Sequence, residues 1–204
     1  MSSKNNKFNY PNFEPKQGHL TQFFQQQFIK YQISIGKLSQ NAMENDEITS
    51  LVASNNPKDP LYFWQLYSIT GEELIHILIE DFYTNIFKDT NNKWFSEEFI
   101  ELGPIKYHVN GQKKFWLDLM GGGYHYTGGY KKLYMKHKMT EIIMTRKGAI
   151  KWMEHMNNTL KTLKNHFQLD NRIYPTIIVF LKFLMEKYAQ EFNFKIHGVF
   201  ESKL

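Results

Sequence analysis

The sequence contains no cysteine among its 204 residues. That absence excludes disulfides, iron–sulfur clusters, zinc sites of the cysteine type and a cysteine nucleophile. Any metal must therefore be held by histidine, carboxylate or tyrosine. Residues 1–7 also lack the apolar core of a secretory signal. We expect an intracellular protein, cytoplasmic or mitochondrial, that is not secreted.

Long hydrophobic runs are also missing. The most apolar run, residues 177–181, is followed by Lys182 and falls far short of the roughly 20 residues that a membrane helix needs. We therefore expect no membrane span. The net charge is only +5, from 25 basic and 20 acidic residues, and no motif that combines aromatic and basic residues for RNA binding occurs. We expect no nucleic-acid partner.

Several catalytic fingerprints are absent as well. The chain has no zinc helix of the His-Glu-x-x-His kind, no phosphate-binding loop ending in Lys-Ser or Lys-Thr, and no Gly-x-Ser-x-Gly elbow. These absences exclude zinc hydrolases, nucleotide-binding proteins of the phosphate-loop class and serine hydrolases of the elbow class. A flavin or nicotinamide fingerprint is missing too.

Composition divides the chain into three parts. Residues 1–60 are rich in Asn, Gln, Ser and Lys and end in a Pro-rich breaker cluster at 55–60. We expect a polar extension over 1–60, a folded domain over 61–195 and a tail over 196–204. Within the extension, aromatic residues between 20 and 35 predict a short helix. Such a helix buries too little area to order 60 residues, so we expect the extension to dock on a partner protein.

The folded part has helical periodicity throughout and no alternating strand pattern. Thr70-Gly71-Glu72-Glu73 reads as a capping box, with Thr70 as the cap, and predicts a helix from Gly71 to about Lys88. Two glycine clusters, at 121–123 and 128–129, interrupt the later helices. The fold class expected is all-α, with these further helical segments: 107–120, 130–137, 145–167 and 175–192.

One face of the segment that begins near residue 107 combines apolar and polar side chains. His108, Gln112, Phe115 and Leu119 fall at i, i+4, i+7 and i+11, so they share one helix face. A buried imidazole and a buried amide cost free energy unless they find partners. This face is therefore a candidate binding surface.

The order of motifs along the chain resembles that of truncated haemoglobins. The resemblance covers about residues 62–195, although the segment between Lys88 and His108 is longer than the family's. The motifs are Phe82-Tyr83, an aromatic-led segment ending in Gly121-Gly122, Tyr126-Thr127-Gly128, Leu133-Tyr134-Met135-Lys136-His137, and Trp152-Met153-Glu154-His155-Met156.

This resemblance implies a truncated, two-over-two helical globin with an N-terminal extension, binding haem b. It places His137 as the iron ligand, with the carbonyl of Leu133 expected to fix the second ring nitrogen. It places Tyr83, His108 and Gln112 on the distal side of the iron, and Trp152 beside the ligand. Phe82 and Phe115 are expected to pack on rings, and Lys136, like Lys132, to pair with a haem propionate.

The function implied is binding of dioxygen or another diatomic ligand, with oxidation of nitric oxide to nitrate as the most plausible activity. That activity needs an external reductase to return the iron to the ferrous state. The alternative is a globin-like accessory or structural subunit of a larger assembly, mitochondrial or otherwise, with or without haem. The polar extension over residues 1–60 favours this alternative.

Overall fold

A computed structural model describes residues 15–44, 61–140, 143–167 and 170–199. Residues 1–14, 45–60 and 200–204, parts of the expected extension and tail, lie outside the described residues. The described part folds into seven α-helices without a strand, so the all-α prediction is confirmed. The helices are α1 (Thr21–Ser34), α2 (Leu66–Phe87), α3 (Lys93–Leu102), α4 (Ile105–Leu119), α5 (Gly129–Lys138), α6 (Arg146–Thr162) and α7 (Ile173–Glu191).

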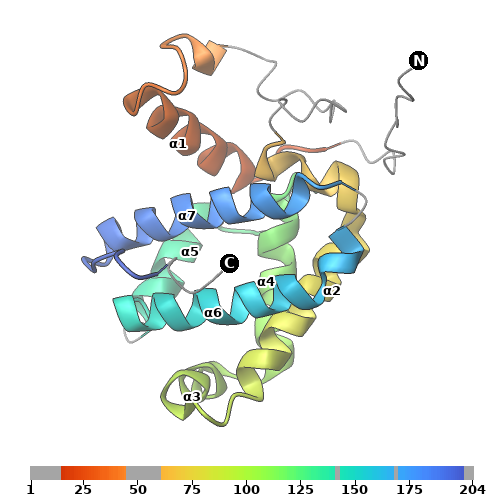
Figure 1. Ribbon diagram of the computed structural model, residues 1–204, viewed down its shortest axis with the longest axis vertical. Coiled ribbons are helices and arrows are strands. Elements are labelled where there is room, and N and C mark those ends of the chain that lie inside the picture. Colours follow the sequence, from red (N-terminus) through yellow and green to blue (C-terminus); the bar gives the residue numbers. More distant parts are fainter. Residues whose placement is uncertain (1–14, 45–60, 141–142, 168–169, 200–204) are drawn as a thin grey trace, which may run out of the picture.

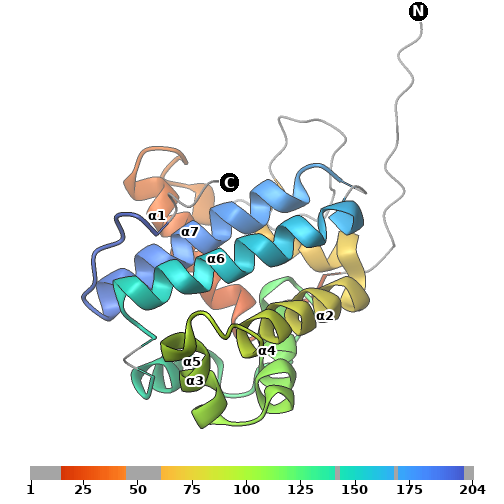
Figure 2. The same ribbon diagram turned by 60° about the horizontal axis from the view of Figure 1, so that its bottom comes forward.

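The helices form two crossed layers. In both ribbon views α6 and α7 run side by side across α2 and α4 (Figures 1 and 2). Helix α2 packs against both α4 and α6, and so joins the layers. The core between them is apolar and rich in aromatic rings, with Phe82, Trp116 and Leu181 almost fully buried. This is the two-over-two arrangement that the sequence predicts.

The predicted capping box at Thr70 is wrong. Helix α2 begins earlier, at Leu66, and is interrupted by Gly71, whose backbone lies at φ 65° and ψ −179°. The hydroxyl of Thr70 donates to the carbonyl of Leu66 at 2.9 Å instead of accepting a bond from the next turn. Glycine adopts this positive φ without the steric cost of a side chain. Gly71 is therefore the kink in α2, and Thr70 belongs to the helical turn before it.

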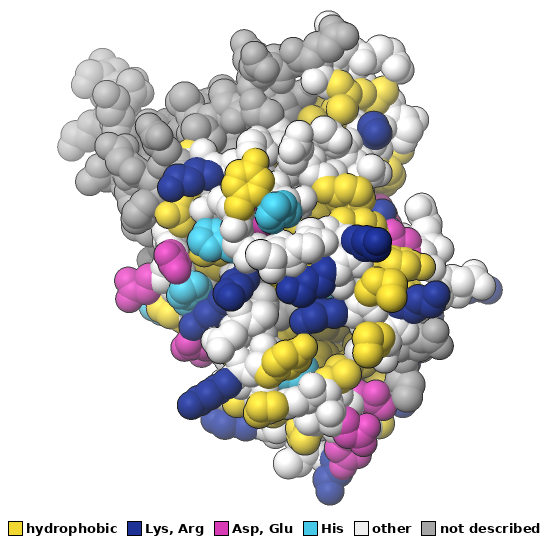
Figure 3. Space-filling model, turned by 180° about the vertical axis from the view of Figure 1, so that it is seen from behind, with side chains coloured by type: hydrophobic (Ala, Val, Ile, Leu, Met, Phe, Trp, Pro, Cys, Tyr) yellow, Lys and Arg dark blue, Asp and Glu magenta, His cyan; other side chains and the backbone are white. Residues whose placement is uncertain are grey.

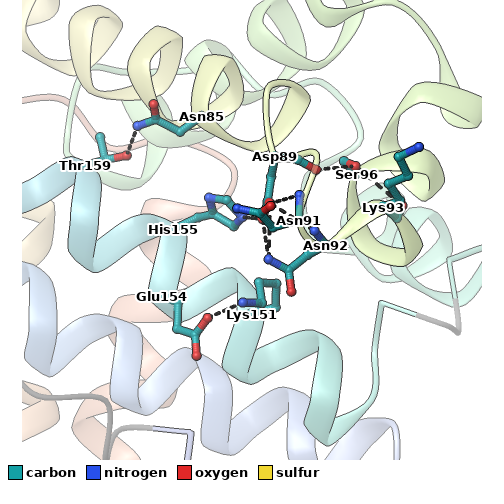
Figure 4. A network of polar contacts seen from close by, with 10 residues as sticks. All are labelled: Asn85, Asp89, Asn91, Asn92, Lys93, Ser96, Lys151, Glu154, His155 and Thr159. Carbon is teal, nitrogen blue, oxygen red and sulfur yellow. Dashed lines mark hydrogen bonds and ion pairs between the residues drawn. The ribbon is translucent and has the colours of Figure 1, made fainter.

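Helix α3 was not expected from the sequence, and a polar network holds it in place (Figure 4). The Asp89 carboxylate accepts bonds from the backbone N–H of Asn92 at 3.0 Å and from His155 Nε2 at 2.9 Å. Burial alone would raise the pKa of Asp89, but the hydrogen bonds from Asn92 and His155 outweigh it and lower that pKa. The Ser96 hydroxyl donates to the backbone carbonyl of Asp89 at 3.0 Å. The network therefore ties the α2–α3 turn to α6.

Helix α1 packs on the globular body. Phe24 lies edge-on to Phe180 of α7, with ring centroids 5.9 Å apart, and Phe28 lies edge-on to Phe183 at 5.5 Å. Phe24 and Phe28 are buried. Part of the segment that was expected to dock on a partner protein thus already has an intramolecular surface. Docking of the rest of residues 1–60 on a partner stays a prediction.

Among the described helices, none combines the length and the apolar character that crossing a membrane requires.

Candidate functional site

A cavity opens between α4, α5, α6 and α7, and most of the predicted site residues line it. The space inside it is about 210 Å³, and the cavity opens to solvent at its mouth. The predicted residues that line it are Tyr83, His108, Gln112, Phe115, Lys136, His137 and Trp152. Phe82 lies behind the wall, with its ring centroid 4.9 Å from that of Trp152. The predicted residues that line the cavity come from four helices far apart in sequence, α2, α4, α5 and α6.

His137 comes from the last turn of α5 and is half-buried. Its ring lies edge-on to that of Tyr188, with centroids 4.6 Å apart. The expected bond to the Leu133 carbonyl is absent, and Nδ1 is buried with no hydrogen-bond partner in the described part of the chain. Burial, with a smaller contribution from Lys136, lowers the pKa of His137 to about 4. The imidazole is therefore neutral near pH 7, with a lone pair free to bind a metal.

His108, from α4, is buried and hydrogen-bonded. Its Nε2 donates to the backbone carbonyl of Phe99 at 2.7 Å, and its ring stacks on Tyr83 with centroids 5.5 Å apart. Burial lowers the pKa of His108, although the carbonyls of Phe99 and Gly103 oppose that effect. The structure therefore brings His108 and Tyr83 together, as the sequence predicts, and fixes the imidazole to α3.

Gln112 and Phe115 extend the same face of α4 along the cavity. Gln112 is half-buried and Phe115 is buried, with its ring 5.7 Å from that of Tyr126. Trp152, half-buried on α6, closes the opposite wall. The spacing of 4 and 3 residues along α4 thus places one imidazole, one amide and one ring in a row on the cavity wall.

Sequence reasoning missed two buried tyrosines of the cavity wall as site residues. Tyr126 lies in the α4–α5 connection, and Tyr188 lies on α7. Burial raises the pKa of Tyr126 to about 12, and it also raises the pKa values of Tyr188 and Tyr83 well above the ordinary tyrosine value. All three phenols therefore keep their protons near pH 7 and can donate hydrogen bonds. The signal for Tyr188 is its position, 4 and 7 residues after Leu184 and Leu181 on one face of α7.

The charge around the cavity has one sign. No Asp or Glu belongs to its described lining, whereas Lys136 does. A second hollow beside the mouth shares Tyr107 and Tyr126 with the cavity and adds Lys114 and Lys132. Lysine and arginine side chains gather among apolar ones on the face opposite to the view of Figure 1, where α4 and α5 lie (Figure 3). The mouth is suited to negatively charged groups.

A model of the bacterial-like globin family matches residues 65–186. The chain therefore belongs to the bacterial-like globin family, and the globin resemblance of its motifs is confirmed. The match falls within the segment 61–195 that was expected to form the folded domain. No curated protein and no solved structure matches the chain.

Haem is the group that globins typically bind, and the residues of the cavity fit it. A buried ring nitrogen without a partner costs free energy that a bound group can recover, and His137 Nδ1 is such an atom. The walls are mostly apolar and aromatic, as a macrocycle requires, while lysines stand at the mouth, as its carboxylates require. The cavity therefore has the donor, the walls and the charge that haem needs.

Proposed function

We propose that this protein binds haem b through His137 and that the distal wall of Tyr83, His108 and Gln112 receives dioxygen or another diatomic ligand. The observation that carries the proposal is a neutral, half-buried imidazole beside an apolar cavity, whose buried Nδ1 has no hydrogen-bond partner among the described residues. When bound, haem supplies a ferrous iron that takes up diatomic ligands. The side chains of this protein hold the haem, orient His137 and donate hydrogen bonds to the ligand.

On the proximal side, packing orients His137. Tyr188 lies edge-on to the imidazole at 4.6 Å, and Phe192 lies edge-on at 6.4 Å, so two rings from the end of α7 limit its rotation. Lys136 is the neighbour of His137 in the chain, and its Nζ lies 5.0 Å above the Tyr107 ring. Lys136 and Lys132 stand where propionate carboxylates can be paired at the mouth.

On the distal side, neutral phenols act as hydrogen-bond donors. Tyr83 is buried, and its raised pKa keeps the hydroxyl protonated. Such a donor favours ligands that gain negative charge, dioxygen above all, over carbon monoxide. Buried aromatic walls also limit the access of water to the ligand. These properties support oxidation of nitric oxide to nitrate, with an electron-donating reductase as the external partner.

Haem titration is the direct test of the proposal. The purified chain should take up one equivalent of haem and develop an intense absorption band at about 400–430 nm, whereas His137→Ala should not, because the ligand is missing. Nitric oxide consumption in the presence of dioxygen and a reductant then tests the finer activity, with nitrate as the product to be measured. A chain that folds but takes up no haem would instead support the alternative role as an accessory subunit.

A further inference from the structure

Asp118 joins two parts of the molecule that lie far apart in sequence. It is fully buried at the end of α4. One carboxylate oxygen, Oδ1, accepts from the backbone N–H groups of Leu20 at 3.0 Å and Thr21 at 3.1 Å. The other, Oδ2, accepts from the N–H of His19 at 3.2 Å and from the N–H of Tyr126 at 3.3 Å. We call this set of four hydrogen bonds the Asp118 anchor.

The anchor supplies what α1 lacks. Helix α1 has no side-chain cap of its own and no acidic residue in its first turn. The first N–H groups of a helix need acceptors, and negative charge is favourable at that end. Asp118 provides both from α4, and the Thr21 hydroxyl adds a bond to the Asp118 backbone carbonyl. The start of α1 is therefore capped by a different helix.

Close packing at Gly18 shows how tightly the two segments fit. A Cβ atom built on Gly18 would lie 2.1 Å from Asp118 Oδ1 and 2.7 Å from the backbone oxygen of Gly123. Next to it, the N–H of Lys16 donates to the carbonyl of Gly121 at 2.7 Å. Only a residue without a side chain allows this approach. Residues 16–18, which precede α1, thus pack closely against the end of α4 and the α4–α5 connection.

The same connection carries Tyr126 into the cavity. Tyr126 is buried, lines the cavity and packs edge-on to Phe115. Helix α1 also reaches the helix of His137, because Phe23 stacks on Tyr130 in the first turn of α5, with ring centroids 4.2 Å apart. Helix α1 therefore contacts both ends of the α4–α5 connection, which separates the distal helix from the proximal one.

We infer that Asp118 is a positioning residue of the ligand pocket, and that through it residues 15–34, which lie before the globin family match, hold Tyr126 in the cavity wall. The N–H groups of His19 and Tyr126 share Oδ2, so the oxygen that holds the segment just before α1 also orients the Tyr126 backbone. The inference rests on the proposed function, because it assumes that the cavity lined by Tyr126 receives a haem ligand.

The test uses the full chain and three variants. Asp118→Asn keeps the size of the side chain but turns an amide N–H₂ toward N–H donors, and Gly18→Ala disturbs the same contact from the N-terminal segment. Asp170→Asn is the matched control, because Asp170 is also a fully buried carboxylate, paired with Arg172 rather than with α1. Amide hydrogen exchange without added haem, and dissociation of dioxygen from the haem-loaded protein, are the two measurements.

We expect Asp118→Asn and Gly18→Ala to exchange at least tenfold faster at residues 19–21 and at Tyr126, and Asp170→Asn to leave these amides unchanged. In the loaded protein the first two variants should change dioxygen dissociation about threefold or more. The change should vanish when Tyr126→Phe is already present, because the anchor acts through that side chain.

Two results would overturn the inference. One is faster exchange at residues 19–21 with Tyr126 and dioxygen dissociation unaffected, which would make Asp118 only a cap for α1. The other is an equal change in Asp170→Asn, which would reduce the effect to general destabilisation. If the wild-type chain binds no haem, the proposed function fails, whereas the exchange measurement still decides whether Asp118 holds Tyr126.

Discussion

The two histidines on opposite walls of the cavity differ in their hydrogen bonding. On the α5–α7 wall, the buried Nδ1 of His137 has no partner in the part of the chain that the structure describes, and the rings of Tyr188 and Phe192 pack against the imidazole. On the α3–α4 wall, His108 Nε2 donates a hydrogen bond to the Phe99 carbonyl, and the imidazole stacks on Tyr83. The first imidazole is available as a ligand, and the second is held as part of the wall. Satisfied and unsatisfied hydrogen bonds thus distinguish two residues of the same type.

The strongest test of this comparison removes the available imidazole. His137→Ala should weaken haem binding by more than about a hundredfold, because even the loss of groups that only support a metal ligand costs 10–100-fold. Haem titration followed by absorption measures the effect. His76→Ala, which removes a half-buried histidine of α2 from outside the cavity lining, should bind haem like the wild type. Wild-type haem affinity in His137→Ala would disprove the assignment.

Replacing His108, the hydrogen-bonded imidazole, should mainly lower the free energy of unfolding. His108→Leu leaves the Phe99 carbonyl buried without its donor, which costs about 1–3 kcal/mol in the free energy of unfolding. Urea unfolding measures this loss. His166→Leu is the comparison, because His166 is exposed and its replacement should stay within about 0.5 kcal/mol. Equal stability in both variants would show that the bond to Phe99 contributes little.

Replacing Tyr83, which stacks on His108, should change ligand dissociation rather than the stability of the fold. Tyr83→Phe keeps the ring stacked but removes one donor, so dioxygen should dissociate roughly tenfold faster, the equivalent of about 1.4 kcal/mol. Stopped-flow dissociation measures the rate. Tyr174→Phe, on α7 and outside the cavity lining, should leave it unchanged. If Tyr83→Phe dissociates at the wild-type rate while His108→Leu does not, the distal donor is the imidazole instead.

A smaller effect concerns a carboxyl group near the proximal helix. Burial raises the pKa of Glu191 to about 7, although Lys187 Nζ lies 2.8 Å from it, and the Tyr130 hydroxyl of α5 donates to the same oxygen. The folded chain then holds this proton to higher pH than the unfolded chain, so stability falls as the pH rises from about 4.5 to 7.

Glu191→Gln should remove that part of the pH dependence. Solvent screening limits the effect to about 1 kcal/mol. Urea unfolding at pH 5 and pH 8 measures it, and the difference between the two pH values should be smaller in Glu191→Gln than in the wild type. Glu186→Gln on the same helix is the control. Identical pH profiles for wild type and Glu191→Gln would show that the carboxyl group is ionised throughout this range.

The sequence predicted those parts of the molecule that depend on local pattern. Helical periodicity predicted the helices that correspond to α4, α5, α6 and α7, and spacing along α4 predicted that His108, Gln112 and Phe115 share a face. The ordered motifs predicted the globin family. All of these depend on neighbours within a few residues of one another, where the 3.6-residue repeat is decisive.

What the sequence did not predict depends on distant partners. The amphipathic spacing of helix α3 was overlooked in the sequence, and the pairing that holds this helix, of Asp89 with His155, joins residues 66 positions apart. The capping box predicted at Thr70 is wrong because Gly71 adopts a positive φ inside α2, which composition does not specify. Asp118 was read as one residue of a motif, since nothing near it in sequence shows that its partners are the amides of residues 19–21 and 126.

The distance along the chain between Asp118 and its partners also has a consequence for biosynthesis. The three bonds to residues 19–21, at the start of α1, span 97–99 residues, so α1 leaves the ribosome long before its cap does. At about 5–20 residues per second the delay is roughly 5–20 s. The aromatic face of α1 is still uncovered when that interval ends, because its partners Phe180 and Phe183 lie further along the chain, and chaperones that bind exposed aromatic segments have time to act.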